Sequence, residues 1–125
     1  MRASKKVKGD KRTDAAPLVE RFPALGTPVR VAWFSGTVAG SGFGPSTYWI
    51  DAVVQVTPQV ASGLSALGAG QQATPRVVDA LAPDVPEGSF VSSPELDAAF
   101  HSDGWRVSAF LQPSSHTLVL SALGQ

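Results

Sequence analysis

The sequence predicts one α+β domain in which an antiparallel four-stranded sheet carries two or three short helices on one face. Two hairpins, at about residues 29–56 and 105–123, are indicated by paired segments in which apolar residues alternate with others. Between the hairpins lie segments that begin with helix-capping residues. The chain of 125 residues contains no cysteine, and its length suffices for one core without disulfide bonds.

The first hairpin contains the clearest strand patterns. In segment 29–34 the odd-numbered residues form one face and the even-numbered residues form the other. Segment 47–56 has a nearly apolar side, formed by its even-numbered residues, and a mixed side that carries Trp49, Asp51 and Val53. Because the predicted helices lie on one face of the sheet, we expect the mixed side to be open to a partner.

The middle of the chain contains two helix-start patterns. A threonine–proline pair at 57–58 supplies a capping hydroxyl and a ring that suits the first helical position, which predicts a helix over 58–67. A serine–proline pair at 93–94 repeats the pattern and predicts a second short helix. Segment 76–83 fits either a helix or a strand, and we favour a helix.

Charge is distributed unevenly along the chain. Residues 1–12 hold six of the ten basic residues and one aspartate, whereas the remainder holds four arginines and nine acidic residues. The net charge is therefore zero, although the two parts have opposite charge. We expect residues 1–14 to form a basic, disordered tail, because so few apolar side chains cannot offset the entropy of ordering. Residues 15–125 then form a single domain with an acidic body.

No secretory signal or membrane span is predicted. The basic start is not followed by the apolar region of a secretory signal. Two long uncharged runs, 31–50 and 52–75, are interrupted by glycine, proline and polar residues, so neither has the composition of a membrane span. We expect a cytoplasmic protein.

Glycines at 36, 40, 42 and 44 raise the question of a phosphate-binding loop. Such loops lead directly into a helix, whose free N–H groups hold the anion. Here the sequence STYWIDAVVQV follows, which is typical of a strand, and no lysine occurs after Lys11. We therefore expect the tip of a long hairpin, which can still act as a contact surface.

No group of residues indicates a metal or catalytic centre. His101, Asp103 and His116 have the composition of an iron site. However, an intervening strand would separate the histidines by about 25 Å at ~3.3 Å per residue. The serines lie outside any nucleophile motif, and a triad of Ser46, Asp51 and His116 stays open without being favoured. We expect no cofactor, no metal and no enzymatic activity.

Asp51 is a charged residue in an apolar strand, where an unpaired carboxylate would be costly. Its expected partner is Arg30 or Arg106 on a neighbouring strand, or solvent on the open face, and the strand register decides between them. An acid that meets a basic partner protein is the alternative. The tryptophans are expected to be core anchors. If Trp33 and Trp49 lie opposite each other on the open face, they form an aromatic patch of the kind enriched at binding hot spots.

The leading functional hypothesis is a non-catalytic protein-binding module, such as an immunity-type inhibitor of a basic protein or an accessory subunit. Its expected contact residues are Trp33, Trp49, Asp51 and Val53 on the open face and Phe43 in the glycine loop. One alternative is binding of nucleic acid or an anionic surface through the basic tail. Another is a small enzyme or ligand-binding domain with a site that sequence motifs do not show. Homo-oligomers formed through a sheet edge also stay possible.

Overall fold

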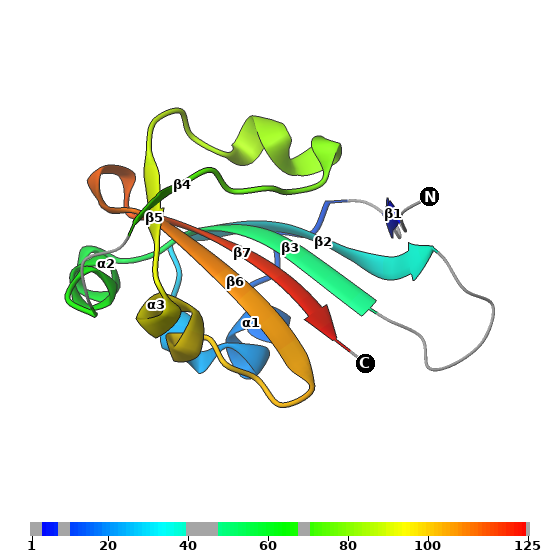
Figure 1. Ribbon diagram of the computed structural model, residues 1–125, viewed down its shortest axis with the longest axis horizontal. Helices are drawn as coiled ribbons and strands as arrows, with labels where there is room; N and C mark the ends of the chain where they lie inside the picture. Colours follow the sequence, from blue (N-terminus) through cyan, green and yellow to red (C-terminus); the bar gives the residue numbers. More distant parts are fainter. Residues whose placement is uncertain (1–3, 8–10, 40–47, 68–70, 125) are drawn as a thin grey trace.

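The computed structural model describes residues 4–7, 11–39, 48–67 and 71–124. It has the predicted α+β class, with one antiparallel sheet and a few short helices (Figure 1). The strand order is β1-β2-β3-β7-β6-β5-β4. In chain order the strands are β1 (Ser4–Val7), β2 (Arg30–Ala39), β3 (Tyr48–Gln55), β4 (Gln71–Ala73), β5 (Phe90–Ser92), β6 (Trp105–Gln112) and β7 (Thr117–Gly124).

The sheet is wider than the four strands that the sequence predicts. The two predicted hairpins are present as β2–β3 and β6–β7, and the pairing of β3 with β7 joins them. Strands β4 and β5 extend this sheet to six strands, and the short β1 lies outside β2. The prediction of four strands is therefore wrong. The reason is that β4 and β5 have three residues each, too few to show an alternating pattern.

The segment before residue 15 contacts the outer edge of β2. Strand β1 pairs antiparallel with the end of β2, with Val7 opposite Gly36. Arg12 forms a bridge with Trp33, in which the backbone N–H of each residue donates to the carbonyl oxygen of the other, at 2.8 and 2.9 Å. Part of the predicted tail is thus hydrogen-bonded to the sheet, whereas the boundary at residue 14 stays a prediction.

The described residues form three α-helices and three 3-10 helices. They are α1 (Ala16–Arg21), η1 (Pro23–Leu25), α2 (Pro58–Ser65), η2 (Asp79–Asp84), α3 (Pro94–Ala99) and η3 (Pro113–Ser115). The predicted caps are present, because Thr57 Oγ1 accepts a hydrogen bond from the N–H of Val60 at 3.2 Å and Ser93 Oγ accepts one from Leu96 at 3.0 Å. None of the helices in the described ranges is both long and apolar enough to cross a membrane.

The α-helices cover one face of the sheet. Leu18 of α1, Leu64 of α2 and Leu96 of α3 belong to a cluster of buried residues that also includes apolar side chains of β2, β3, β6 and β7. In Figure 1, α1 and α3 lie below the central strands β6 and β7. We call this side of the sheet the helix face.

The opposite face of the sheet is also covered. Leu81 of η2 and Phe90 pack against Trp49 and Val53 of β3 in a second buried cluster. Figure 1 shows the segment with η2, in yellow-green, above the strands. The prediction of helices on one face only, with the mixed face open, is therefore wrong. The sequence favours a helix over 76–83, and the structure has a 3-10 helix over Asp79–Asp84 that contains Pro83. The sequence pattern does not show which face of the sheet this segment covers.

Candidate functional site

Three of the predicted contact residues lie beneath the cover formed by η2. Trp49 and Asp51 are fully buried, and Val53 is 7% exposed. Asp51 Oδ2 accepts a hydrogen bond from the backbone N–H of Val78 at 2.9 Å, and its Oδ1 accepts one from the Ser121 hydroxyl at 3.0 Å. Asp51 therefore connects the covering segment to the sheet.

The strand register does not match the partners expected for Asp51. Residue 51 lies opposite Phe34 on β2 and opposite Ser121 on β7. Arg30 lies opposite Gln55, and Arg106 lies opposite Leu123. The expectation of solvent around Asp51 on an open face is wrong, since the carboxylate is fully buried under the cover.

The tryptophans of the first hairpin lie on different faces. Trp33 belongs to the buried cluster of the helix face, whereas Trp49 belongs to the cluster of the covered face. In the register Trp33 lies opposite Ala52, and Trp49 lies opposite Gly36. The predicted aromatic patch of these two residues is therefore absent. Phe43 lies outside the described residues, and β3 continues from residue 48 as the predicted strand.

The histidines lie at opposite ends of β6, as the sequence predicts. His101 precedes the strand, and its Nε2 is 3.3 Å from Asp103 Oδ1 on the exposed surface. His116 follows the strand and adopts a left-handed conformation with a φ of 51°. Among the residues that the structure describes, no three His, Asp or Glu side chains are grouped as metal ligands.

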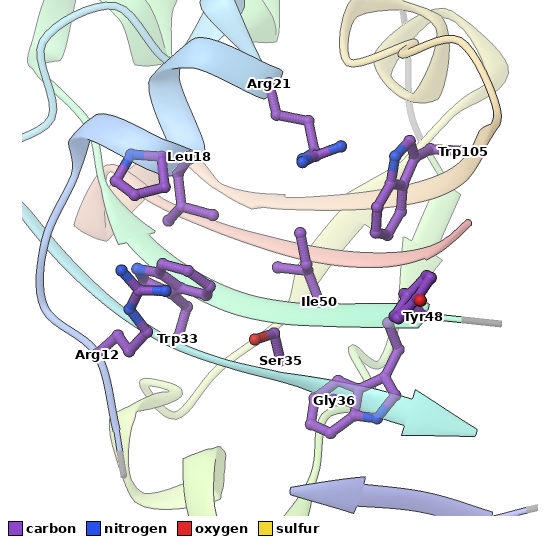
Figure 2. Close-up of a pocket in the computed structure, with 11 residues that line it drawn as sticks. Arg12, Leu18, Arg21, Trp33, Ser35, Gly36, Tyr48, Ile50 and Trp105 are labelled. Atoms are coloured by element: carbon purple, nitrogen blue, oxygen red, sulfur yellow. The ribbon is translucent and has the colours of Figure 1, made fainter. Parts of the chain in front are cut away.

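A half-open cavity of about 490 Å³ lies at one end of the helix face. Aromatic, arginine and aliphatic residues line it, together with one serine hydroxyl (Figure 2). We call it the aromatic hollow, and its lining consists of Arg12, Pro17, Leu18, Arg21, Trp33, Ser35, Gly36, Tyr48, Trp49, Ile50 and Trp105. The described residues that line it include two cations and no acidic side chain.

The missing side chain of Gly124 makes room for one wall of the hollow. Tyr48 and Trp105 flank Gly124 on the two neighbouring strands of the sheet. The Trp105 ring lies across Gly124, so a Cβ atom at this position would be 2.3 Å from Trp105 Cδ2. No side chain could share that space. The glycine therefore fixes where the indole of Trp105 lies.

We expect Gly124→Ala to displace the Trp105 ring and to remove this wall. The overpacking should lower the free energy of unfolding by about 1–2 kcal/mol. The indole N–H signal of Trp105 in a two-dimensional NMR spectrum should move more than those of the other tryptophans. Gly63→Ala in α2 is the control, because its Cβ would meet no atom within 4 Å. If the Trp105 signal does not move in the Gly124 variant, Gly124 does not fix the position of the Trp105 indole.

Arg12 forms the second wall with Trp33. Its guanidinium carbon lies 4.2 Å from the centroid of the Trp33 ring. Its Nε and Nη2 donate to the two carboxylate oxygens of Asp14 at 3.1 and 2.5 Å, and the indole Nε1 of Trp33 donates to the Asp14 carbonyl oxygen at 2.9 Å. The charge of Arg12 is thus balanced by a neighbouring carboxylate.

The ion pair changes the acidity of Asp14. Hydrogen bonds from Arg12 lower the pKa of this exposed carboxyl below its ordinary value of 3.8. A lowered pKa means that the pair is intact at neutral pH and is lost as the pH falls through the lowered value. We expect Arg12→Gln to return the pKa of Asp14 towards 3.8, as measured by a carboxyl ¹³C NMR titration. Lys11→Gln should leave it unchanged, since Lys11 pairs with Asp84.

Arg21 differs from Arg12 in its partners. Its guanidinium carbon lies 4.7 Å from the centroid of the Trp105 ring. Within the described ranges, no carboxylate lies at ion-pair distance from it. A guanidinium stacked by its face on a ring keeps its N–H donors, which lie in its plane, available to other groups. Arg21 is therefore the cation of the hollow that can receive an anion.

Of the residues that line this site, Trp33 and Trp49 are also among the contact residues expected from the sequence, and the others are not. Its aromatic–arginine pairs join residues 12 and 33, and residues 21 and 105. Neither pair has a spacing that predicts contact, and Arg12 belongs to the basic tail that the sequence predicts to be disordered. One usable signal was present, namely a glycine in an otherwise apolar final strand, which indicates a close approach of another group.

The chain matches no protein-family model, and searches of curated proteins and of solved structures found no match. The lining of the hollow offers stacking surfaces, apolar surface, guanidinium donors and hydroxyl groups. Among the described residues of its lining, none is a histidine or carries a carboxylate.

Proposed function

We propose that the protein is a non-catalytic binding module and that the aromatic hollow holds its guest. The observation that carries this proposal is the combination of a half-open cavity of about 490 Å³ with two arginine–tryptophan stacks in its wall. Cavities of ~300–1,000 Å³ with mostly apolar lining and few polar groups are typical of small-molecule sites. The volume of the hollow lies within this range, and its lining combines aromatic side chains with two arginines, which supports a guest with both apolar and polar groups.

The proposal keeps the binding role suggested by the sequence, but the binding surface is the aromatic hollow on the helix face instead of the mixed face of the sheet. The mixed sheet face, which the protein-binding hypothesis required, lies beneath η2. The hollow on the helix face supplies a recessed surface in its place. Its exposed parts include the Tyr48 ring, which is 47% exposed. A guest would cover this ring as well as the stacked arginines.

A fragment screen by NMR on the full chain tests the proposal. Guests should shift the indole N–H signals of Trp33 and Trp105 in a saturable way and leave in place the amide signal of Leu81, which is fully buried on the opposite face of the sheet. Trp105→Leu should abolish the shifts. Each guest should be recovered unchanged by mass spectrometry after incubation. Shifts that map away from the hollow, or chemical conversion of the guest, would overturn the proposed function.

A further inference from the structure

We infer that the aromatic hollow takes a small planar ring that carries a negatively charged group, with the ring over Ile50 and the charge at Arg21. This inference rests on the proposed function, because it names the class of guest for the same site. Two kinds of molecule share this chemistry, aromatic carboxylates and mononucleotides. Both combine a flat apolar ring with an anion a few bonds away.

The floor and walls of the hollow favour a flat ring. Figure 2 shows Ile50 in the centre, with Trp33 on one side and Trp105 on the other. Leu18 and Ile50 line the hollow and are 1% and 7% exposed, so its floor is apolar and closely packed. Aromatic rings pack against indole rings in offset or edge-to-face arrangements that aliphatic groups cannot form. A planar guest therefore gains more from this lining than a branched aliphatic guest of equal size.

The charges of the hollow favour an anion. Arg12 and Arg21 both line it, and the described lining has no acidic side chain to attract a cation. Asp14 accepts hydrogen bonds from Nε and Nη2 of Arg12, whereas Arg21 has no carboxylate partner within the described ranges. In Figure 2 the guanidinium of Arg21 extends from α1 towards the space above Ile50. Its N–H groups can thus form charge-assisted hydrogen bonds to an anion on the ring.

The Asp14 carboxylate limits the affinity for such a guest. It lies beside the hollow and forms a two-pronged contact with the Arg12 guanidinium. An anionic guest cannot use the same Nε and Nη2 donors while this contact is present. Asp14→Asn removes the competing charge, so this variant should bind an anionic ring more tightly than the natural protein.

Titration calorimetry with matched probes tests the inference. Indole-3-acetate is compared with its neutral counterpart indole-3-ethanol, and adenosine 5′-monophosphate with adenosine. Acetate and inorganic phosphate test the anion without a ring. We expect the anionic member of at least one pair to bind about tenfold more tightly than its neutral counterpart, which corresponds to ~1.4 kcal/mol. The pair that shows the difference identifies the carboxylate or the phosphate source.

Variants of exposed arginines separate the role of Arg21 from general charge effects. Arg21→Gln should remove the tenfold preference, whereas Arg21→Lys should keep part of it, because the charge stays and the planar fork is lost. Arg106→Gln is the matched control, since Arg106 is exposed on the opposite face of β6 and should leave the preference unchanged. Thermal unfolding of each variant verifies that it is folded.

The outcomes distinguish the inference from the proposed function. The inference of a negatively charged guest is wrong if charged and neutral rings bind equally, or if Arg21→Gln keeps the preference for the charged ring. The hollow would then still be a binding site. The inference of a planar guest is wrong if acetate or inorganic phosphate binds more tightly than every aromatic probe. If no probe shifts the Trp33 and Trp105 signals at millimolar concentration, the inference fails, and the fragment screen then decides separately on the proposed function.

Discussion

Replacing Trp49 by alanine is expected to lower the free energy of unfolding by about 4 kcal/mol, because a fully buried aromatic side chain leaves a large cavity. Its indole packs with Phe90 and Val119 in the cluster between the sheet and η2. The change should appear as a lower urea midpoint with little change in slope.

Trp105→Ala is the matched control for this result. Trp105 is only half-buried, so Trp105→Ala should lower the free energy of unfolding by about half as much as Trp49→Ala. It should also abolish guest binding. The two variants thus compare the stability contributed by a fully buried indole with that of a partly exposed one. A Trp49 variant with natural stability would show that this indole does not pack beneath η2.

Asp51→Ala should destabilise the protein by about 3 kcal/mol, because buried donors that lose their acceptor cost about 1–3 kcal/mol each. The donors include the backbone N–H of Val78 and the hydroxyl of Ser121. Since Val78 belongs to the segment that covers the sheet, hydrogen exchange around η2 should also become faster. Chemical denaturation and hydrogen-exchange mass spectrometry measure the two effects.

The control for Asp51 is Asp79→Ala, an exposed acid at the start of η2. Surface substitutions of this kind change stability by ~0.5 kcal/mol or less. Asp51→Asn gives a finer test, because it keeps one acceptor oxygen and places an amide group towards a donor. Its stability should lie between those of Asp51→Ala and the natural protein. Equal stability of Asp51→Ala and Asp79→Ala would show that Asp51 does not hold the cover.

The strands of the first hairpin could be predicted because their side chains alternate over many residues. The expected faces of segment 29–34 are found, with Val31 and Trp33 in one buried cluster and Ala32 and Phe34 in the other. The two capped helices could be predicted for a similar reason, since the capping residue and proline act locally. These elements could thus be predicted from capping residues and from side-chain alternation that continues over many residues.

The cover of the mixed face could not be predicted from the same patterns. Although a helix is favoured over 76–83, the local pattern does not show which face of the sheet it covers, because the segment is held by contacts such as the hydrogen bond from Val78 to Asp51, 27 residues away. Without this cover, a buried aspartate and tryptophan resemble an exposed binding surface. The hollow escaped prediction for a related reason, because its arginines and tryptophans meet only after β6 and α1 are placed on the same sheet.

The strand order also has a consequence for synthesis of the chain on the ribosome. Strand β3 completes its pairing only with β7, and Asp51 and Ser121 are 70 positions apart. At a synthesis rate of ~5–20 residues per second, about 4–14 s pass between the synthesis of the β2–β3 hairpin and that of β7. During this time a row of backbone N–H and C=O groups is free to pair with another nascent chain. A chaperone that holds extended apolar segments would protect the hairpin until residues 117–124 have been translated.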